Sequence, residues 1–279
     1  MIIQRYNLTI VTGMVLILGA ATASGQGFKR EVADIFAEVT AEEPTVVSEA
    51  DLVGLPESVQ RYLRYTGVVG QPRIQAVRLK QRGDMRRAPD KPWMPMKAVE
   101  YYTTNPPAFI WKGDFKAAPL FKITALDRYR HGRGNMRIKL LGLFKVADLR
   151  APELDHATLI RFFSEGIWFP TVFLEDYVTW EAVDSLSAKV TMTYEGVTAS
   201  GVFTFNELGQ AVNFETERYM EKEGTFELKP WSTPIEGYRE MNGMMIPSSG
   251  EAVWHLEDGE FPYWRGEIFD LEYNQPSAY

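Results

Sequence analysis

The stretch Ser187–Tyr194, SAKVTMTY, decides the fold class of this chain. Apolar or aromatic residues occupy every second position, and serine, lysine or threonine stands between them. Side chains of a β-strand point alternately to the two faces of a sheet, so this pattern predicts a strand with one face in a core and the other in water. Half-buried strands of this kind are typical of antiparallel sheets.

The same period of two recurs through most of the chain after Arg73. Further strands are expected at about residues 77–85, 121–125, 136–140, 198–206, 211–219, 236–241, 250–257 and 262–273. Turn-forming residues separate several of them, as in Asn206–Gly209, Asn242-Gly243 and Glu257–Gly259. Many short strands separated by turns predict a sandwich or a barrel.

Three stretches depart from this pattern and predict helices, at about residues 27–41, 56–65 and 152–165. The third is strongly apolar, Gly166 is its expected stop, and the aromatic run Ile167–Pro170 follows directly. Such a helix between two runs of strands is expected to pack across the concave face of a curved sheet. The predicted class is therefore mainly β (α+β): a curved antiparallel sheet or half-barrel with this helix across its concave face and short N-terminal helices.

The first residues predict an export signal. Leu8–Ala21 is apolar and uncharged, follows the single charge of Arg5, and leads to Ala21-Thr22-Ala23, which suits a signal peptidase. This stretch is shorter than the roughly 20 residues of a spanning helix, but retention of residues 8–21 as an inner-membrane anchor stays an alternative. We expect a signal peptide or anchor at 1–23, a helix and linker at 24–54, a single half-barrel domain at 55–279, and a periplasmic or extracellular location.

The composition excludes several classes of site. Cysteine is absent and only three histidines are present, which excludes disulfides, thiolate metal sites, a cysteine nucleophile and a lipid-modified cysteine. The formal net charge of −7 argues against a nucleic-acid partner, because such a partner requires a basic face. No metal and no other cofactor is expected.

Standard catalytic motifs are absent from the sequence. Glu153–His156 matches E-x-x-H, but di-iron sites use two copies with further glutamates, so a polar helix start is favoured. Arg128, Arg130 and Arg133 form a basic run around a predicted turn. A solvated hairpin end is favoured there over a site for an anionic headgroup. No catalytic residue is assigned.

Aromatic residues and methionines are the strongest positive signal. Apolar pockets are lined by such side chains, but a core requires the same residues, so both interpretations stay open. The positions favoured as the wall of a ligand site lie near the prolines around residue 95, at residue 111, in the apolar helix and at its aromatic exit: Trp93, Met96, Trp111, Phe162, Phe163, Trp168 and Phe169.

Four segments resemble an uncharacterised bacterial family that is known as a domain of unknown function. They are LPESVQRY at 55–62, GIWFPT at 166–171, IPSSGEAVW at 246–254 and YWRG at 263–266. The resemblance covers about residues 50–275 and implies an architecture similar to the lipoprotein-carrier fold, a half-barrel whose open side is closed by helices. Proteins of that fold often hold acyl chains, although lipoproteins of that group carry a lipidation cysteine that this chain lacks.

These observations favour an exported binding or carrier protein for a lipid or another apolar small molecule. One alternative is an envelope enzyme that uses polar residues near Glu251 and Arg265, where charged groups stand among apolar strand residues. Another is a scaffold that meets a membrane or envelope protein through a sheet edge or an apolar patch.

Overall fold

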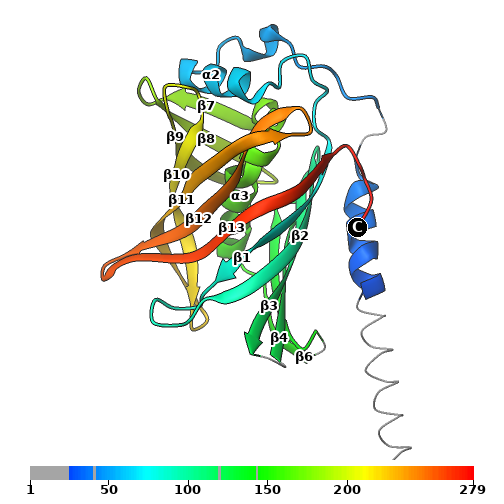
Figure 1. Ribbon diagram of the computed structural model, residues 1–279, viewed down its shortest axis with the longest axis vertical. Helices are drawn as coiled ribbons and strands as arrows, with labels where there is room; N and C mark the ends of the chain where they lie inside the picture. The colour runs from blue at the N-terminus through cyan, green and yellow to red at the C-terminus, as the bar shows by residue number, and fades with distance from the viewer. Residues whose placement is uncertain (1–24, 40–41, 119–120, 143) are drawn as a thin grey trace, which may run out of the picture.

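The alternating stretches form one antiparallel sheet that curls into a half-barrel (Figure 1). The computed structural model describes residues 25–39, 42–118, 121–142 and 144–279, so the expected signal peptide lies outside the described residues. Within them, 13 strands follow the order β6-β5-β4-β3-β2-β1-β13-β12-β11-β10-β9-β8-β7. The predicted fold class is confirmed.

The strands of one arm, which precede the central helix, are β1 (Ala76–Met85), β2 (Met94–Thr104), β3 (Pro107–Ala118), β4 (Phe121–Arg130), β5 (Arg133–Leu140) and β6 (Phe144–Leu149). The strands of the other arm are β7 (Val178–Ala182), β8 (Ser187–Tyr194), β9 (Val197–Phe205), β10 (Ala211–Lys222), β11 (Thr225–Met241), β12 (Met244–Leu256) and β13 (Gly259–Tyr273). The arms join where β1 pairs with β13, with Val77 opposite Tyr273. The first and last strands therefore form the middle of the sheet.

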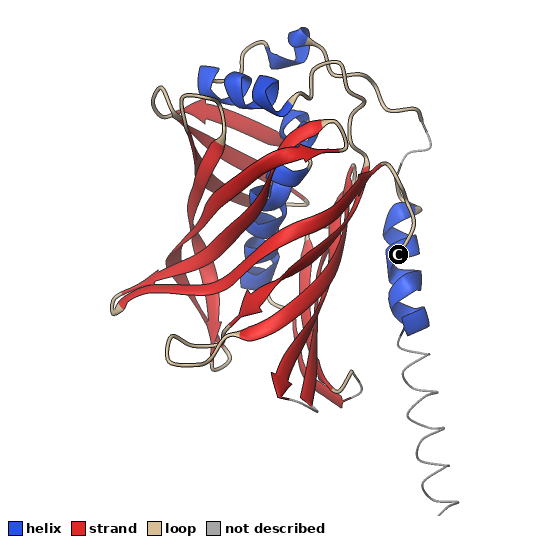
Figure 2. Ribbon diagram, viewed as in Figure 1, coloured by secondary structure: helices blue, strands red, loops and turns tan. Residues whose placement is uncertain are grey.

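The helix α3 (Pro152–Ser164) lies inside the curve of the sheet (Figure 2). It contacts β4 and β5 on one arm and β9 and β10 on the other, so it closes the open side of the half-barrel. The α-helix ends at Ser164, close to the expected stop at Gly166. The chain continues through η2 (Glu165–Trp168) and η3 (Pro170–Leu174), and a Cβ at Gly166 would lie only 2.8 Å from Val172 Cγ1.

The remaining helices lie at the periphery. Above the sheet in Figure 1, η1 (Glu49–Leu52) leads to α2 (Glu57–Thr66), which ends at Gly67 with a left-handed φ of 76°. The first helix, residues 25–36, packs on the convex face of the sheet. No helix among the described residues has the length and apolar character needed to cross a membrane.

The strands β2, β3, β6 and β7 were not predicted. For β2 and β3 the reason is that the first helix buries their second face. Tyr102 and Phe109 belong to the core on the concave face, whereas their neighbours Tyr101 and Ile110 pack in a second core beneath the first helix. With both faces covered, these strands lose the alternation of apolar and polar residues that marks half-buried strands.

A glycine sets how closely α3 approaches β5, and this contact gives a testable prediction. A Cβ at Gly134 would lie 2.5 Å from Thr158 Oγ1 and 2.6 Å from the Leu154 carbonyl oxygen. Gly134→Ala should therefore lower the free energy of unfolding by about 1–3 kcal/mol in denaturant titrations, as expected for overpacking. Gly27→Ala is the control, because nothing lies within 4 Å of its Cβ position. An equal effect of both substitutions would contradict the close approach.

Candidate functional site

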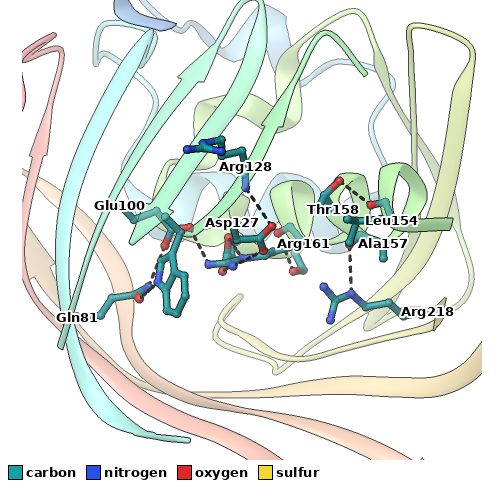
Figure 3. Close-up of polar contacts among 12 residues, drawn as sticks. Gln81, Glu100, Asp127, Arg128, Leu154, Ala157, Thr158, Arg161 and Arg218 are labelled. Carbon is teal, nitrogen blue, oxygen red and sulfur yellow. Dashed lines mark hydrogen bonds and ion pairs between the residues drawn. The ribbon is translucent and has the colours of Figure 1, made fainter. Parts of the chain in front are cut away.

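A single arginine on α3, Arg161, binds three carboxylates inside the half-barrel (Figure 3). Its Nη2 lies 2.8 Å from Glu100 Oε1 on β2, and its Nη1 lies 2.7 Å from Asp127 Oδ2 on β4. Its Nε lies 3.0 Å from Glu165 Oε1, one turn further along the chain. Charge-assisted bonds from all three guanidinium nitrogens thus tie the closing helix to two strands of one arm.

Further side chains complete the network around Glu100, which has no exposed surface. Gln81 Nε2 donates to Glu100 Oε2 at 3.1 Å, and Trp111 Nε1 donates to Gln81 Oε1 at 2.8 Å. The next inward residue of β2, Tyr102, donates its hydroxyl to Glu165 Oε2 at 2.9 Å. The polar groups of this buried cluster are therefore bonded to one another, as burial requires.

Burial controls the protonation of the cluster, in which three acids face one base. Burial raises the pKa of Glu100 well above its ordinary value of 4.5, and the nearby Glu165 carboxylate adds to this shift. Burial also raises the pKa of Glu165. Burial alone would lower the pKa of Arg161, but the surrounding carboxylates outweigh it and raise that pKa well above its ordinary value. The guanidinium stays charged, and Glu100 and Glu165 hold a proton to higher pH than exposed carboxyls do.

A second arginine approaches α3 from the opposite arm. Arg218 on β10 donates from Nε to the Ala157 carbonyl oxygen at 3.2 Å and from Nη1 to the Tyr263 hydroxyl at 3.3 Å. Its guanidinium lies 4.9 Å from the centre of the Trp231 ring and 5.8 Å from that of Trp254. Unlike Arg161, it forms no ion pair with a carboxylate of the described residues.

Four of the seven residues predicted to line a ligand site lie in a packed aromatic core. Phe162, Phe163 and Phe169 have no exposed surface, and Trp168 is also buried. The Phe162 and Phe169 ring centres are 5.7 Å apart, and the Phe169 and Tyr102 ring centres are 4.6 Å apart. Side chains therefore fill the space between the apolar residues of α3 and the sheet.

The other three predicted residues divide between the two faces of the sheet. Met96 and Trp111 are buried on the concave face of neighbouring strands, and the guanidinium of Arg161 lies 5.0 Å from the centre of the Trp111 ring. Trp93 lies in the β1–β2 connection, between the guanidinium groups of Arg86 and Arg265 at 4.6 and 4.5 Å. The structure thus places Trp111 beside the Arg161 cluster, Met96 on the same face opposite Phe115, and Trp93 elsewhere.

The polar residues on which the alternative prediction of an enzyme rested lie on the convex face of the sheet. Glu251 and Arg265 are opposite each other on β12 and β13, one position out of phase with the concave pair of Ala252 and Trp264. Arg265 forms its ion pair with Asp84, at 3.1 Å. These residues are therefore separated from the Arg161 cluster by the sheet itself.

Two open, shallow pockets lie away from the core side of α3. One, of about 600 Å³, lies between the first helix, the β4–β5 turn and the start of α3, and the other, of about 450 Å³, lies beside His255. No group of three or more His, Cys, Asp or Glu side chains in the described part of the chain is placed to hold a metal ion. His156 of the E-x-x-H motif contacts the Tyr219 ring, with 5.4 Å between the ring centres.

The sequence analysis missed Glu100, Asp127 and Arg161, although two signals were present. Arg161 is the only arginine or lysine in the apolar helix, and it lies between Ile160 and Phe162. Glu100 occurs in phase with Ala98 and Tyr102, so alternation places it on the core face of its strand. A charge at a core position requires a partner, and this requirement could have paired the two residues.

Residues 45–266 match the model of a family of unknown function, DUF6544. This match confirms the resemblance drawn from the sequence. No curated protein matches the chain.

Several solved structures are similar at low identity. A domain named for outer membrane lipoprotein sorting, from Vibrio parahaemolyticus, is 9% identical with a TM-score of 0.42, over 72% of this chain and 86% of that one. A LolA superfamily protein from Nitrosomonas europaea is 10% identical with a TM-score of 0.37, over 82% and 94%. A DUF1329 family protein from Desulfovibrio piger is 11% identical with a TM-score of 0.43, over 79% and 93%.

Removing the shared guanidinium should destabilise the fold strongly. Arg161→Met leaves the three carboxylates buried without their cation, which is expected to lower the free energy of unfolding by about 3–5 kcal/mol. Arg64→Met is the control, because Arg64 and its partner Glu49 are both exposed and such pairs contribute about 0–1 kcal/mol. Adding Glu100→Gln to Arg161→Met should restore part of the loss. A loss below 1 kcal/mol for Arg161→Met in denaturant titrations would contradict this role.

The raised pKa of Glu100 predicts that this carboxyl contributes more stability to the fold as the pH falls from 8 towards 5. The unfolded chain protonates this carboxyl only near its ordinary pKa of 4.5, whereas the folded chain holds the proton to higher pH. Folding therefore takes up a proton in this window, and each such proton contributes up to about 1.4 kcal/mol per pH unit. The stabilisation is complete below the unfolded pKa and is lost as the pH rises through the folded pKa.

Glu100→Gln should flatten this pH dependence, measured as unfolding free energy from pH 5 to pH 8. The raised pKa of Glu165 leaves a smaller slope in the variant. Glu57→Gln is the matched control, since Glu57 is an exposed residue of α2, and it should keep the slope of the unchanged protein. The assignment would be wrong if Glu100→Gln and Glu57→Gln gave the same slope.

Proposed function

Because the chain belongs to DUF6544, a family of unknown function, its role has to be inferred from its own site, and we propose that it binds an apolar molecule. The binding surface is the concave face of the sheet beyond the Arg161 cluster, away from α2. The molecule is a lipid or another apolar compound that the protein holds or carries.

The observation that carries this proposal is a strip of half-exposed apolar side chains on that face. The strip contains Met85, Ile123, Met220, Tyr263 and Trp264, which come from both arms of the sheet. Each packs against the main core and still retains exposed surface. Apolar side chains left partly open to water on a concave face are typical of a site that a ligand covers.

Glycines hold two indoles flat against this part of the sheet. A Cβ at Gly113 would lie 2.3 Å from the Trp111 ring, and a Cβ at Gly266 would lie 2.7 Å from the Trp264 ring. Rings that cover glycines of their own strand extend the apolar surface without projecting far from it. Flat aromatic walls of this kind suit a long or flat apolar molecule better than a branched polar one.

Among the predicted wall residues, Met96 and Trp111 form the inner end of the proposed site. They adjoin the strip through Met85 and Phe115, which lie on neighbouring strands. Phe162, Phe163, Trp168 and Phe169 support the site from behind as part of the packed core. The Arg161 cluster then marks the polar end at which the apolar surface stops.

We also propose that the protein acts outside the cytoplasm. The support is the sequence of residues 1–23, in which the apolar stretch Leu8–Ala21 precedes small residues that suit cleavage. Retention of residues 8–21 would hold the same site at the inner membrane. Either form is compatible with a ligand of low solubility in water.

Binding of the apolar dye Nile red to the purified protein tests the site. Met85→Asp and Ile123→Asp place a carboxylate in the half-exposed strip, which should weaken dye binding at least about tenfold, since covering the charge with an apolar ligand would cost more than 1.4 kcal/mol. Phe269→Asp is the matched control, because Phe269 is exposed, and its ring lies 5.6 Å from the guanidinium of Arg82.

Lipid extraction from the same preparations gives the second readout. Mass spectrometry should find an apolar compound bound to the unchanged protein and to Phe269→Asp, and less of it on Met85→Asp. Phe269→Asp, an exposed substitution, should keep the free energy of unfolding of the parent within about 0.5 kcal/mol. Met85→Asp and Ile123→Asp change side chains that pack against the core, so their unfolding is measured alongside and binding is compared under conditions in which each variant is fully folded. The absence of both dye binding and extractable lipid would refute the proposal.

A further inference from the structure

Two neighbouring hairpins of the sheet end in exposed apolar residues. Phe121 at the start of β4 is 52% exposed, and Phe144 and Val146 of β6 are 65% and 67% exposed. Leu141, in the β5–β6 turn, is 43% exposed. Isolated exposed apolar residues are common on protein surfaces, but a group of large ones marks an interaction site.

Strand pairing brings these residues together at one edge of the sheet. Ile123, two positions after Phe121, lies opposite Leu140, and Leu140 lies opposite Phe144. The backbone N–H of Leu141 donates to the Lys122 carbonyl oxygen at 2.7 Å. We call Phe121, Leu141, Phe144 and Val146 the apolar tip.

Lysines line the other face of the same strands. Lys116 lies opposite Lys122 across β3 and β4, and Lys139 lies opposite Lys145 across β5 and β6. Directly opposed like charges destabilise a sheet, so two such pairs at adjacent strand ends are costly for the isolated protein. Asp114 and Asp148, which lie 2.9 Å from Lys122 Nζ and 3.4 Å from Lys145 Nζ, offset part of this charge.

The tip is thus locally basic in a chain whose formal net charge is −7. Apolar side chains flanked by lysines match the layers of an anionic bilayer, in which headgroups attract the cations and the acyl boundary accepts the apolar residues. An acidic protein partner would also attract lysines, but two protruding phenylalanines beside them favour the layered surface of a membrane.

The start of the first helix supports the same orientation. This helix begins at the end of the molecule towards which the β3–β4 and β5–β6 hairpins point (Figure 1). The sequence before it is apolar from Leu8 to Ala21. A chain held in a membrane through that stretch would present the apolar tip to the same membrane.

We propose that the apolar tip and its lysines dock the protein on an anionic lipid bilayer. The inference is independent of the proposed apolar ligand, because it concerns a different surface and a bilayer instead of a single bound molecule. A protein that binds no ligand could still dock, and a ligand-binding protein could lack docking.

Vesicle flotation tests the docking with protein that starts at Gly25, which contains every described strand and both cores. The vesicles consist of phosphatidylcholine alone or of phosphatidylcholine mixed with an equal part of phosphatidylglycerol. Binding is expected only to the mixed vesicles, and it should weaken as salt is added. Absence of binding, or equal binding to both vesicles, would overturn the proposal.

Two double variants separate the apolar and the charged contributions. Phe121→Ser/Phe144→Ser should reduce the partition coefficient at least about tenfold, because the inserted apolar area is lost. Lys116→Gln/Lys145→Gln should reduce it by about fivefold for each lysine. The lysine variant should keep or raise the unfolding midpoint, since it removes one charge from each opposed pair, so its loss of binding cannot come from unfolding.

Val53→Ser/Leu208→Ser is the matched control. These residues are 80% and 70% exposed, and they lie near α2, at the opposite end of the molecule from the apolar tip. The control should bind mixed vesicles like the parent. A control variant that loses as much binding as the two tip variants would show a non-specific effect of surface polarity and would contradict docking through the tip.

Discussion

The bond network of Arg161 is the constraint on which the rest of this structure depends. A half-barrel has an open side, and α3 closes it by contacting β4 and β5 on one arm and β9 and β10 on the other. Apolar contacts alone would let such a helix slide or rotate between the arms. Two carboxylates on separate strands, Glu100 and Asp127, are bonded to different guanidinium nitrogens and hold the helix at one depth and rotation against this arm, while Glu165 orients the guanidinium from the same helix end.

This fixed position divides the concave face into two regions of different character. On the α2 side of Arg161, rings such as Phe162 and Phe169 pack without exposed surface, so that region is core. On the other side, the sheet extends past the start of α3 and its apolar residues keep exposed surface. Burying three acids between these two regions costs free energy of folding, and retaining a proton on Glu100 reduces that cost.

The sequence predicted those helices and strands whose apolar residues repeat at one regular spacing along the chain. Strands with one wet face, such as β8, and the apolar helix α3 were expected near their observed positions. Strands β2 and β3 were missed because the first helix removes their wet face, which is a tertiary effect that no local pattern records. The same limit applies to the site, because Glu100, Asp127 and Arg161 are distant in sequence and meet only through the curvature of the sheet. The aromatic content of the sequence could not show which residues form the core and which line a ligand site. The burial of each side chain in the structure distinguishes the two groups.

One face of β4 connects the regions that the separate proposals concern. Phe121, Ile123 and Asp127 occupy alternate positions, so they lie on the same face at the apolar tip, in the half-exposed strip and in the Arg161 cluster. An apolar molecule that left a bilayer at the tip would meet the strip next, because Phe121 and Ile123 lie two positions apart on this face. It would stop at the cluster, because covering those carboxylates would remove polar groups from their bonds without replacing them. Docking and binding can each fail alone, but this shared strand face explains why both surfaces occur at the same end of one sheet.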